Sequence, residues 1–321
     1  MEINIIYNIN CLDGLKTLPN NSIDCCVTSP PYYGLRDYGV IGQIGLEETP
    51  EVYIEKLVEI FMEVYRVLKP TGTLWLNIGD SYWGGKGYSG SSAGIYQYER
   101  RKEGKTITRE CSNFGGKGTI SPTNKKHEYI KAKDLIGIPW MLAFALRNAG
   151  WYLRQDIVWN KVNPMPESVK DRCTKSHEYI FLLTKSAKYY FDNKAILEPA
   201  AYEGRIDTIY KGGPKDMNCT AHERWANRIG DQPARNKRDV WSVCTSAGKE
   251  IHFAVFPERL IVDCIKAGCP EHGIILDPFM GSGTTAVVAR KLCRNYIGFE
   301  LNPMYVKIAE RKIYNKLGLF K

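Results

Sequence analysis

The sequence predicts an α/β fold, a mostly parallel sheet with helices on both faces. The main sign is the end of the chain, where strand and helix patterns alternate at 274–277, 284–292, 296–300 and 303–317. A second sign is a set of short apolar runs upstream that end in Gly or Pro, as buried strands do. A chain of 321 residues is long enough for one large domain of this class, or for a core with a smaller module.

The chain upstream of this unit has the same alternation. The pattern predicts strands and helices, in order, at 3–7, 11–18, 23–27, 50–68, 73–78, 134–149, 152–159 and 257–267. The helix at 50–68 is the best marked, because apolar residues recur at helical spacing and Thr49 with Pro50 forms a typical start. Residues 177–184 and 188–191 are expected to form two strands of an antiparallel hairpin.

Two long stretches lack a sustained period. Residues 99–133 carry ten Lys or Arg against four Glu, within a Gly- and Ser-rich segment. This segment is either a mobile, solvated insertion or a basic arm that orders on a nucleic-acid backbone. The second stretch, 198–246, interleaves basic and aromatic residues, which suits contact with phosphates and bases but equally a poorly patterned subdomain. Its candidate nucleic-acid-binding side chains are Arg205, Lys211, Arg224, Arg228, Arg235, Lys237 and Arg238.

Composition argues against several classes of protein. The longest apolar runs are far too short to cross a bilayer, and the first residues have neither the basic start nor the apolar core of a secretion signal. Ten scattered cysteines form no CxxC pair, so we expect free thiols in a reducing cytoplasm and no metal site. The net charge of +9 permits a polyanionic partner without requiring one.

The chain is organised around the stretch Thr28-Ser29-Pro30-Pro31-Tyr32. Two consecutive prolines continue neither a sheet ladder nor a helix, so the preceding strand must end here in a stiffened loop. The loop offers a Ser hydroxyl, carbonyls whose positions are set by proline φ angles, and a flat aromatic ring. This set suits holding a planar amine by two acceptors while the ring stacks on it. An ordinary turn after a strand is the alternative.

A Gly-rich turn follows the strand at 274–277, and its sequence is Asp277-Pro-Phe-Met-Gly-Ser-Gly-Thr284. Its glycines and the following helix N-terminus let the backbone approach a ligand closely. Glu300 closes the next strand, where an acidic residue typically binds the ribose hydroxyls of an adenosine. A dinucleotide site is the rival, but its second half would have to lie upstream. Both sites would lie at the carboxyl ends of parallel strands, so that a methyl donor can face an exocyclic amine.

These motifs resemble those of the amino-methylating DNA methyltransferases of bacteria and phages, with the catalytic motif before the cofactor motif as in the beta class. The resemblance covers almost the whole chain and rests on Thr28–Tyr32, the turn at 277–285 and Ile297-Gly-Phe-Glu300. It implies a class I S-adenosylmethionine-dependent methyltransferase fold, circularly permuted, with a mostly parallel seven-stranded sheet and an antiparallel edge hairpin. It also implies a catalytic half at 1–81 and 132–197, an insertion loop at 82–131, a target-recognition region at 198–246 and a cofactor-binding half at 247–321.

By this resemblance the cofactor is S-adenosylmethionine. Glu300 would bind the ribose, and Asn10 would take the place near the adenine amine where the family usually has Asp. An Asn carbonyl can accept the same hydrogen bond. The residues expected to bind the cofactor are Asn10, Phe253, Glu258, Asp277, Phe279, Gly281, Gly283, Thr284 and Glu300.

The resemblance further implies methyl transfer to an exocyclic amine of a base flipped out of duplex DNA. Ser29 and the Pro30 carbonyl would each accept an amine N–H, Pro31 would stiffen the clamp, and Tyr32 would stack on the base. A Ser at the first clamp position resembles the cytosine-N4 members, with adenine-N6 as the alternative. An RNA or protein amide methyltransferase fits less well, because such enzymes usually place the cofactor loop first. The expected partner is double-stranded DNA, for a monomer or homodimer without membrane contact that acts either alone or with a restriction endonuclease counterpart.

Overall fold

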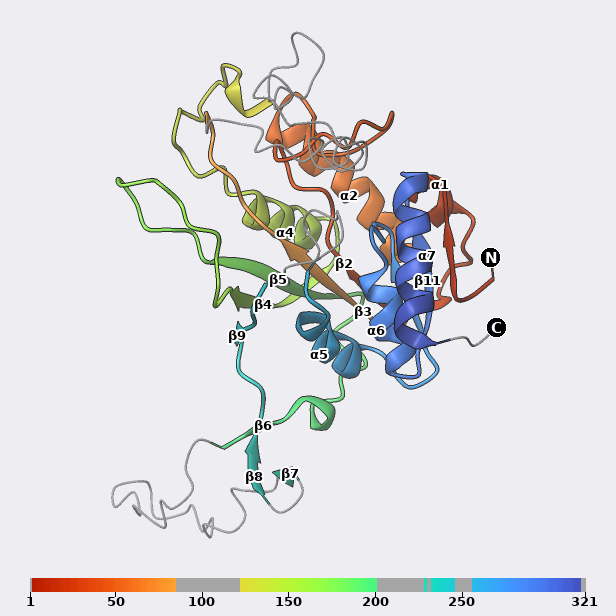
Figure 1. Cartoon of the computed structure of the whole chain (residues 1–321). Helices are drawn as coiled ribbons and strands as arrows, with labels where there is room; N and C mark the ends of the chain where they lie inside the picture. Colours follow the sequence, from red (N-terminus) through yellow and green to blue (C-terminus); the bar gives the residue numbers. More distant parts are fainter. Residues whose placement is uncertain (1, 85–121, 201–227, 230–231, 246–255, 319–321) are drawn as a thin grey trace, which may run out of the picture.

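The structure, a computed structural model, describes residues 2–84, 122–200, 228–229, 232–245 and 256–318 (Figure 1). Within these residues an eight-stranded sheet forms the centre of the molecule, and helices cover both of its faces. A separate three-stranded sheet lies apart from this body, toward the bottom of Figure 1. The predicted α/β class with a mostly parallel sheet is therefore confirmed.

In the central sheet all neighbouring strands pair in parallel except at one strand, β5, which is antiparallel to both of its neighbours. The spatial order is β1 (Ile5–Tyr7), β11 (Asn295–Phe299), β10 (Ile274–Asp277), β2 (Ile23–Thr28), β3 (Leu68–Ile78), β5 (His177–Thr184), β4 (Tyr152–Asn160) and β9 (Val240–Ser242). The first strand of the chain thus lies beside the last one. This is the arrangement that a circular permutation requires.

Two hydrophobic layers hold the helices against the sheet. Side chains of β2 alternate between them, with Cys26 in one layer and Cys25 and Val27 in the other. Because β2 is buried on both faces, it has the largely apolar run that predicted it, interrupted only by Asp24. The first layer lies beneath α1 (Cys11–Lys16), α2 (Pro50–Val67) and α4 (Ile138–Asn148). The second lies beneath α5 (Glu258–Gly268), α6 (Thr284–Lys291) and α7 (Pro303–Leu317).

The antiparallel part of the sheet differs from the predicted hairpin. Strand β5 pairs with β3 and β4, whereas residues 188–191 form no strand. The backbone N–H groups of Tyr190 and Asp192 donate instead to the carbonyls of Thr71 and Ala267, each at 2.9 Å. A short aromatic run suits such turn contacts as well as a ladder, so its pattern alone was misleading. Strand β9 adds an eighth strand at this edge.

The predicted helices are present with shifted bounds. Helix α2 begins after its N-cap Thr49 and ends at Val67, so that β3 starts five residues before the predicted 73. Helix α4 begins at Ile138 instead of 134, because Gly137 has a left-handed φ of 87°. The carboxylate of Asp80, at the end of β3, accepts the N–H groups of Gly137 and Ile138 and so caps this helix from the sheet.

The two stretches without a clear period are only partly described. Near the predicted insertion loop, Tyr82 forms an antiparallel bridge with Leu135, Trp83 is buried, and the 3-10 turn η2 spans Pro122–Asn124. Residues 85–121 lie outside the described part of the chain. The second stretch supplies β9 and the small sheet, which follows the 3-10 turn η3 (Lys194–Ile196) and has the order β6 (Glu198–Pro199), β8 (Gln232–Arg235) and β7 (Arg228–Ile229).

Three further observations concern the described residues only. No helix among them is long and apolar enough to cross a membrane. Their cysteines are all free thiols, and no cluster of His, Cys, Asp or Glu side chains in the same residues is arranged to hold a metal ion.

Candidate active site

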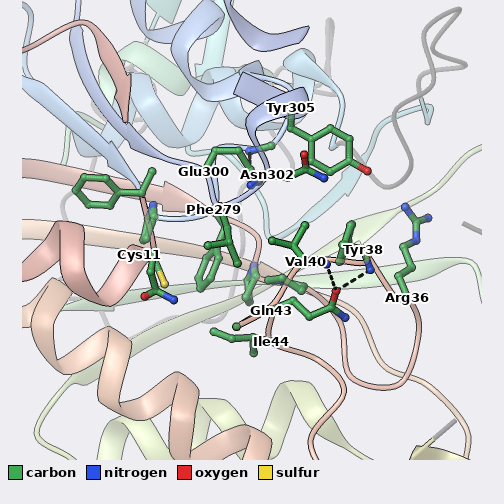
Figure 2. Close-up of a pocket in the computed structure, with 18 of the residues that line it drawn as sticks. Cys11, Arg36, Tyr38, Val40, Gln43, Ile44, Phe279, Glu300, Asn302 and Tyr305 are labelled. Carbon is green, nitrogen blue, oxygen red and sulfur yellow. Dashed lines mark hydrogen bonds between the residues drawn. The ribbon is translucent and has the colours of Figure 1, made fainter. Parts of the chain in front are cut away.

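One pocket at the carboxyl edge of the sheet collects all of the predicted clamp residues and four of the nine predicted cofactor residues (Figure 2). It lies where β2, β10 and β11 end, because parallel strands present their carboxyl ends at one edge. From the predicted sets, the residues that line it are Ser29, Pro30, Pro31 and Tyr32 together with Asn10, Phe279, Gly281 and Glu300. The predicted clamp and the predicted adenosine site therefore share one cavity.

Glu300 is the main polar group on the cofactor side of this pocket. Its two carboxylate oxygens accept the backbone N–H groups of Gly281, at 2.9 Å, and Asn302, at 2.8 Å. Burial raises the pKa of this carboxyl to about 7, although both N–H contacts act to lower it. Each oxygen keeps a second lone pair, so the side chain can still accept two hydroxyl groups from a ligand.

Asp277 lies behind the pocket instead of lining it. Its fully buried carboxylate accepts the hydroxyl of Thr28 and the hydroxyl of Thr285, each at 2.6 Å, and the N–H of Phe279 at 3.0 Å. Burial raises its pKa to about 6 against these three donors. Asp277 therefore ties the end of β2 to the Gly-rich turn and to the start of α6. It braces both halves of the pocket.

Other predicted cofactor residues are also placed away from the pocket lining. A Cβ on Gly283 would come within 2.9 Å of the Cβ of Ala309, so this glycine allows α7 to pack closely. Thr284 begins α6, and its hydroxyl accepts a hydrogen bond from Lys312 at 2.8 Å. Glu258 begins α5 and forms ion pairs with Lys291 and Lys316. Phe253 lies outside the described residues.

The Tyr32 side chain is held in place by residues outside the pocket lining, which the sequence did not point to. Its hydroxyl donates to Glu178 Oε2 at 2.7 Å and lies 3.2 Å from Asn77 Oδ1. The other oxygen of Glu178 forms an ion pair with Lys161. A Cβ on Gly79 would come within 2.6 Å of the Tyr32 ring, so only glycine leaves room for the ring there. These groups come from β3, β5 and the end of β4.

A loop that follows the clamp covers the pocket, and its residues were also missed. Tyr38, Val40, Gln43 and Ile44 line the cavity from this side (Figure 2). The Gln43 side-chain oxygen accepts the N–H groups of Tyr38, at 2.8 Å, and Val40, at 3.4 Å, which closes the loop on itself. Its side-chain nitrogen is buried and has no hydrogen-bond partner among the described residues. The richness of this segment in Tyr and Gly was the available signal.

The predicted nucleic-acid contacts in 198–246 are engaged in ion pairs where the structure describes them. Arg235 and Arg238 both donate to Glu198 Oε1, at 2.8 and 2.6 Å. Lys237 pairs with Asp263 at 2.9 Å, which joins this segment to α5. The backbone of Arg228 belongs to β7. Arg205, Lys211 and Arg224 lie outside the described residues.

Comparison with known proteins identifies the family. A family model described as DNA methylase, of the N6/N4 methyltransferase group, matches residues 23–311. The chain belongs to this family. It is an S-adenosylmethionine-dependent DNA methyltransferase of the N4/N6 amino-methylating group. The match spans both halves of the pocket, from β2 to α7.

Two curated relatives are similar over nearly the whole chain. The Type II methyltransferase M.Cfr9I of Citrobacter freundii is 44% identical over 316 residues, which cover 98% of this chain and 89% of the relative. The Type II methyltransferase M.SmaI of Serratia marcescens is 44% identical over 305 residues, 95% of this chain and 88% of the relative.

Solved structures agree on the fold. The cytosine-N4-specific PvuII DNA methyltransferase has a TM-score of 0.61 at 16% identity, with 97% of this chain and 91% of that chain covered. The S-adenosylmethionine complex of M1.HpyAVI has a TM-score of 0.51 at 18% identity, with 96% and 98% covered. The class I methyltransferase fold predicted from the sequence is thus confirmed.

The hydrogen-bonding and aromatic groups of the pocket fit S-adenosylmethionine. Glu300 offers acceptors for a diol, the unpartnered Gln43 nitrogen offers a buried donor, and Phe279 with Tyr305 adds aromatic surface. An orphaned polar group in a buried position is costly unless a ligand satisfies it. A nucleoside with hydroxyl groups and ring nitrogens would supply acceptors and donors of the matching kind.

Proposed function

We propose that this enzyme transfers a methyl group to the exocyclic N4 amine of a cytosine flipped out of a specific site in duplex DNA. The observation that carries the proposal is the shared pocket. Ser29, Pro30 and Tyr32 face the same cavity as Glu300 and Phe279. A planar amine held at the clamp would lie beside a cofactor held at Glu300. Proximity of this kind is worth on the order of 7–11 kcal/mol in favourable intramolecular reactions.

The clamp acts on the lone pair of the amine nitrogen. In cytosine this lone pair is delocalised into the ring, so the amine is a poor nucleophile. In the proposal the Ser29 hydroxyl oxygen and the Pro30 carbonyl each accept one N–H, which draws the nitrogen toward tetrahedral geometry. The next carbonyl, that of Pro31, accepts a hydrogen bond from the Tyr53 hydroxyl at 2.7 Å. That contact supports Pro30 as the acceptor, because it fixes the orientation of the loop.

The remaining groups of the pocket hold the reactants. S-adenosylmethionine supplies an electrophilic methyl group on a sulfonium sulfur. Attack by the amine lone pair would form the N–C bond while the C–S electron pair goes to sulfur, and the nitrogen would release one proton to solvent water. Glu300 would bind the ribose hydroxyls, and Asn10, which lines the same pocket, would accept a hydrogen bond from the adenine amine. Tyr32 would stack on the flipped base with its aromatic face.

The choice of cytosine over adenine is supported by the Ser at the first clamp position, which resembles the cytosine-N4 members of the family. The fold also resembles that of the cytosine-N4-specific PvuII enzyme. The curated relatives are named Type II methyltransferases, which supports a defined DNA site and a restriction endonuclease counterpart. The predicted recognition region at 198–246 would read that site.

The test starts from unmethylated genomic DNA incubated with the purified enzyme and S-adenosylmethionine. Nucleosides released by digestion are then identified by mass spectrometry, and the modified positions are mapped by sequencing. We expect N4-methylcytosine at one short recurrent sequence. N6-methyladenine would replace the base assignment and keep the clamp. Methylation scattered over unrelated sequences would contradict a specific site.

The clamp itself is tested by Ser29→Ala. Loss of one acceptor that acts on the reacting nitrogen should lower kcat by about 10²–10³-fold. Binding of S-adenosylmethionine, measured by calorimetry, should change little because Ser29 acts on the base. A kcat equal to that of wild type in this variant would contradict the role of Ser29 as an acceptor for the amine.

A further inference from the structure

A chain of polar side chains runs from the clamp into the protein and ends in a partly buried ion pair. Ser29 Oγ lies 3.5 Å from the Tyr32 hydroxyl, which lies 2.7 Å from Glu178 Oε2. The second oxygen of Glu178 pairs with Lys161 Nζ. The side chains of Glu178 and Lys161 are only 13% and 22% exposed, so water screens this pair weakly. Only the first two members of the chain line the pocket.

Hydrogen bonding along this chain has one favoured direction. An ionised carboxylate accepts and never donates, and Asn77 Nδ2 and Lys161 also donate to Glu178. The Tyr32 proton therefore points to Glu178, in a short charge-assisted hydrogen bond. Burial, with Glu178 beside it, keeps the pKa of the Tyr32 hydroxyl well above its usual value, so this proton is retained.

The orientation of the Tyr32 hydroxyl also sets the orientation of the Ser29 hydroxyl. Because the Tyr32 proton is committed to Glu178, the Tyr32 oxygen is left with lone pairs and accepts the Ser29 proton. The Ser29 oxygen then presents lone pairs, and no proton, to the pocket. The Ser29 to Tyr32 distance of 3.5 Å is the longest link, and contacts of this kind in ligand-free sites shorten when a substrate binds.

We propose that Glu178 is a positioning residue that makes Ser29 an acceptor for the target amine. The negative charge of Glu178 acts on Ser29 indirectly, through Tyr32. A carboxylate within the clamp would act on the amine directly. A lone serine hydroxyl has no preferred role, since it can donate or accept. Lys161 and Asn77 hold the carboxylate in place. The inference rests on the proposed amine methylation and adds a residue to it from β5.

The experiment compares single-turnover rates on DNA with S-adenosylmethionine affinity in five variants. Glu178→Gln removes the charge, and Tyr32→Phe removes the link while keeping the ring. We expect each to lower the methyl-transfer rate roughly tenfold to a hundredfold. Both should keep cofactor affinity within about twofold, because Glu178 does not line the pocket and Tyr32→Phe keeps the ring that does. The double variant should be no slower than the slower single variant, since both changes cut one chain.

The fourth variant separates this role from a merely structural one. Ser29→Asp places a carboxylate in the clamp, which accepts without any help from Tyr32. When Ser29 has been replaced by Asp, adding Glu178→Gln should lower the methyl-transfer rate by less than about threefold. An additive double variant of Tyr32→Phe with Glu178→Gln, or an unchanged rate in Glu178→Gln alone, would overturn the inference. Those results would leave wild-type methylation intact, whereas failure of the proposed function would show as no methylated base with the wild-type enzyme.

Thermal unfolding of each variant guards against a trivial loss of fold. Glu63→Gln is a control on α2, where the partly exposed Glu63 pairs with Arg66 at 2.8 Å and does not line the pocket. It should keep the full single-turnover rate. A similar drop in this control would mean that the assay reports stability and would remove the support for Glu178.

Discussion

The two sides of the pocket are built in different ways. On the cofactor side, Glu300, Gly281 and Asn302 are neighbours within a short β-α-β segment, and the hydrogen bonds of the Glu300 carboxylate stay inside it. On the base side, the residues that fix Tyr32 come from β3, β5 and the end of β4, which are far apart in the sequence. One side is a local motif, and the other is an assembly of distant strands.

The difference predicts different consequences of mutation. A change in the local motif should affect cofactor binding and little else, because its partners lie in the same segment. A change in the assembled side should affect the rate of methyl transfer, because the assembly sets where one ring and one hydroxyl point. Asp277 is the exception, since it bonds to β2 and to the Gly-rich turn at once. It is the residue at which the two sides meet.

The largest effect is expected for Asp277→Ala. The change leaves the hydroxyls of Thr28 and Thr285 and the N–H of Phe279 without an acceptor in a fully buried site. At about 1–3 kcal/mol for each unsatisfied group, partly relieved by rearrangement, we expect the free energy of unfolding to fall by about 3–5 kcal/mol. Denaturant titration measures this loss, and both cofactor affinity and turnover should fall with it.

Asp277→Asn is the matched control. Its remaining oxygen can still accept from Thr28 and Phe279, and its NH2 group can donate to the Thr285 oxygen, so the loss should stay below about 1 kcal/mol. Equal stability of the Ala and Asn variants would show that Asp277 does not join the two sides.

A smaller effect, confined to the base side, is expected for Gly79→Ala. The new Cβ would lie 2.6 Å from the Tyr32 ring and 3.3 Å from the Glu178 carboxyl carbon, so the ring must shift. A displacement of this size should lower kcat by roughly tenfold to a hundredfold while S-adenosylmethionine affinity stays unchanged. Gly150→Ala is the control, because its φ of 113° brings strain but no atom lies within 4 Å of the new Cβ. A kcat equal to that of wild type in Gly79→Ala would show that the packing around the Tyr32 ring does not set the rate, and would contradict the difference between the two sides of the pocket.

The same difference explains what the sequence predicted. The turn at 277–284 and Glu300 could be found because a contiguous pattern carries them, and the strands and helices around them lie within a residue or two of their expected bounds. Ser29 and Tyr32 could be found for the same reason. Their places in one pocket follow from parallel strands ending at one edge.

The partners of Tyr32 could not be found in this way. Glu178 and Asn77 come together only because β5 runs antiparallel beside β3, with Asn77 paired to Ile180 and Ile78 to Tyr179. The sequence placed β5 in a hairpin with 188–191, and that error hides this register. Tertiary pairing of strands depends on the whole sheet, so no local pattern encodes it.

The smallest expected effect is a pH dependence of cofactor binding. Burial raises the pKa of Glu300 to about 7, so the free enzyme loses the carboxylate form as the pH falls below 7. Two ribose hydroxyls would donate to that carboxylate, so binding favours the ionised form and lowers its pKa in the complex. Affinity for S-adenosylmethionine should therefore rise with pH, by about tenfold from pH 6 to pH 8.

Calorimetry over this range measures the profile, and two variants assign it. Glu300→Gln cannot ionise, so its weaker binding should be nearly independent of pH. Asp277→Asn should keep the pH dependence with a midpoint slightly below that of wild type, because Asp277 lies behind the pocket and its charge only adds to the burial that raises the pKa of Glu300. A midpoint that persists in Glu300→Gln and vanishes in Asp277→Asn would assign the dependence to the brace. Cofactor binding would then depend on Asp277, which joins the cofactor side to the clamp. The cofactor side would not be the local motif that the hydrogen bonds of the Glu300 carboxylate indicate.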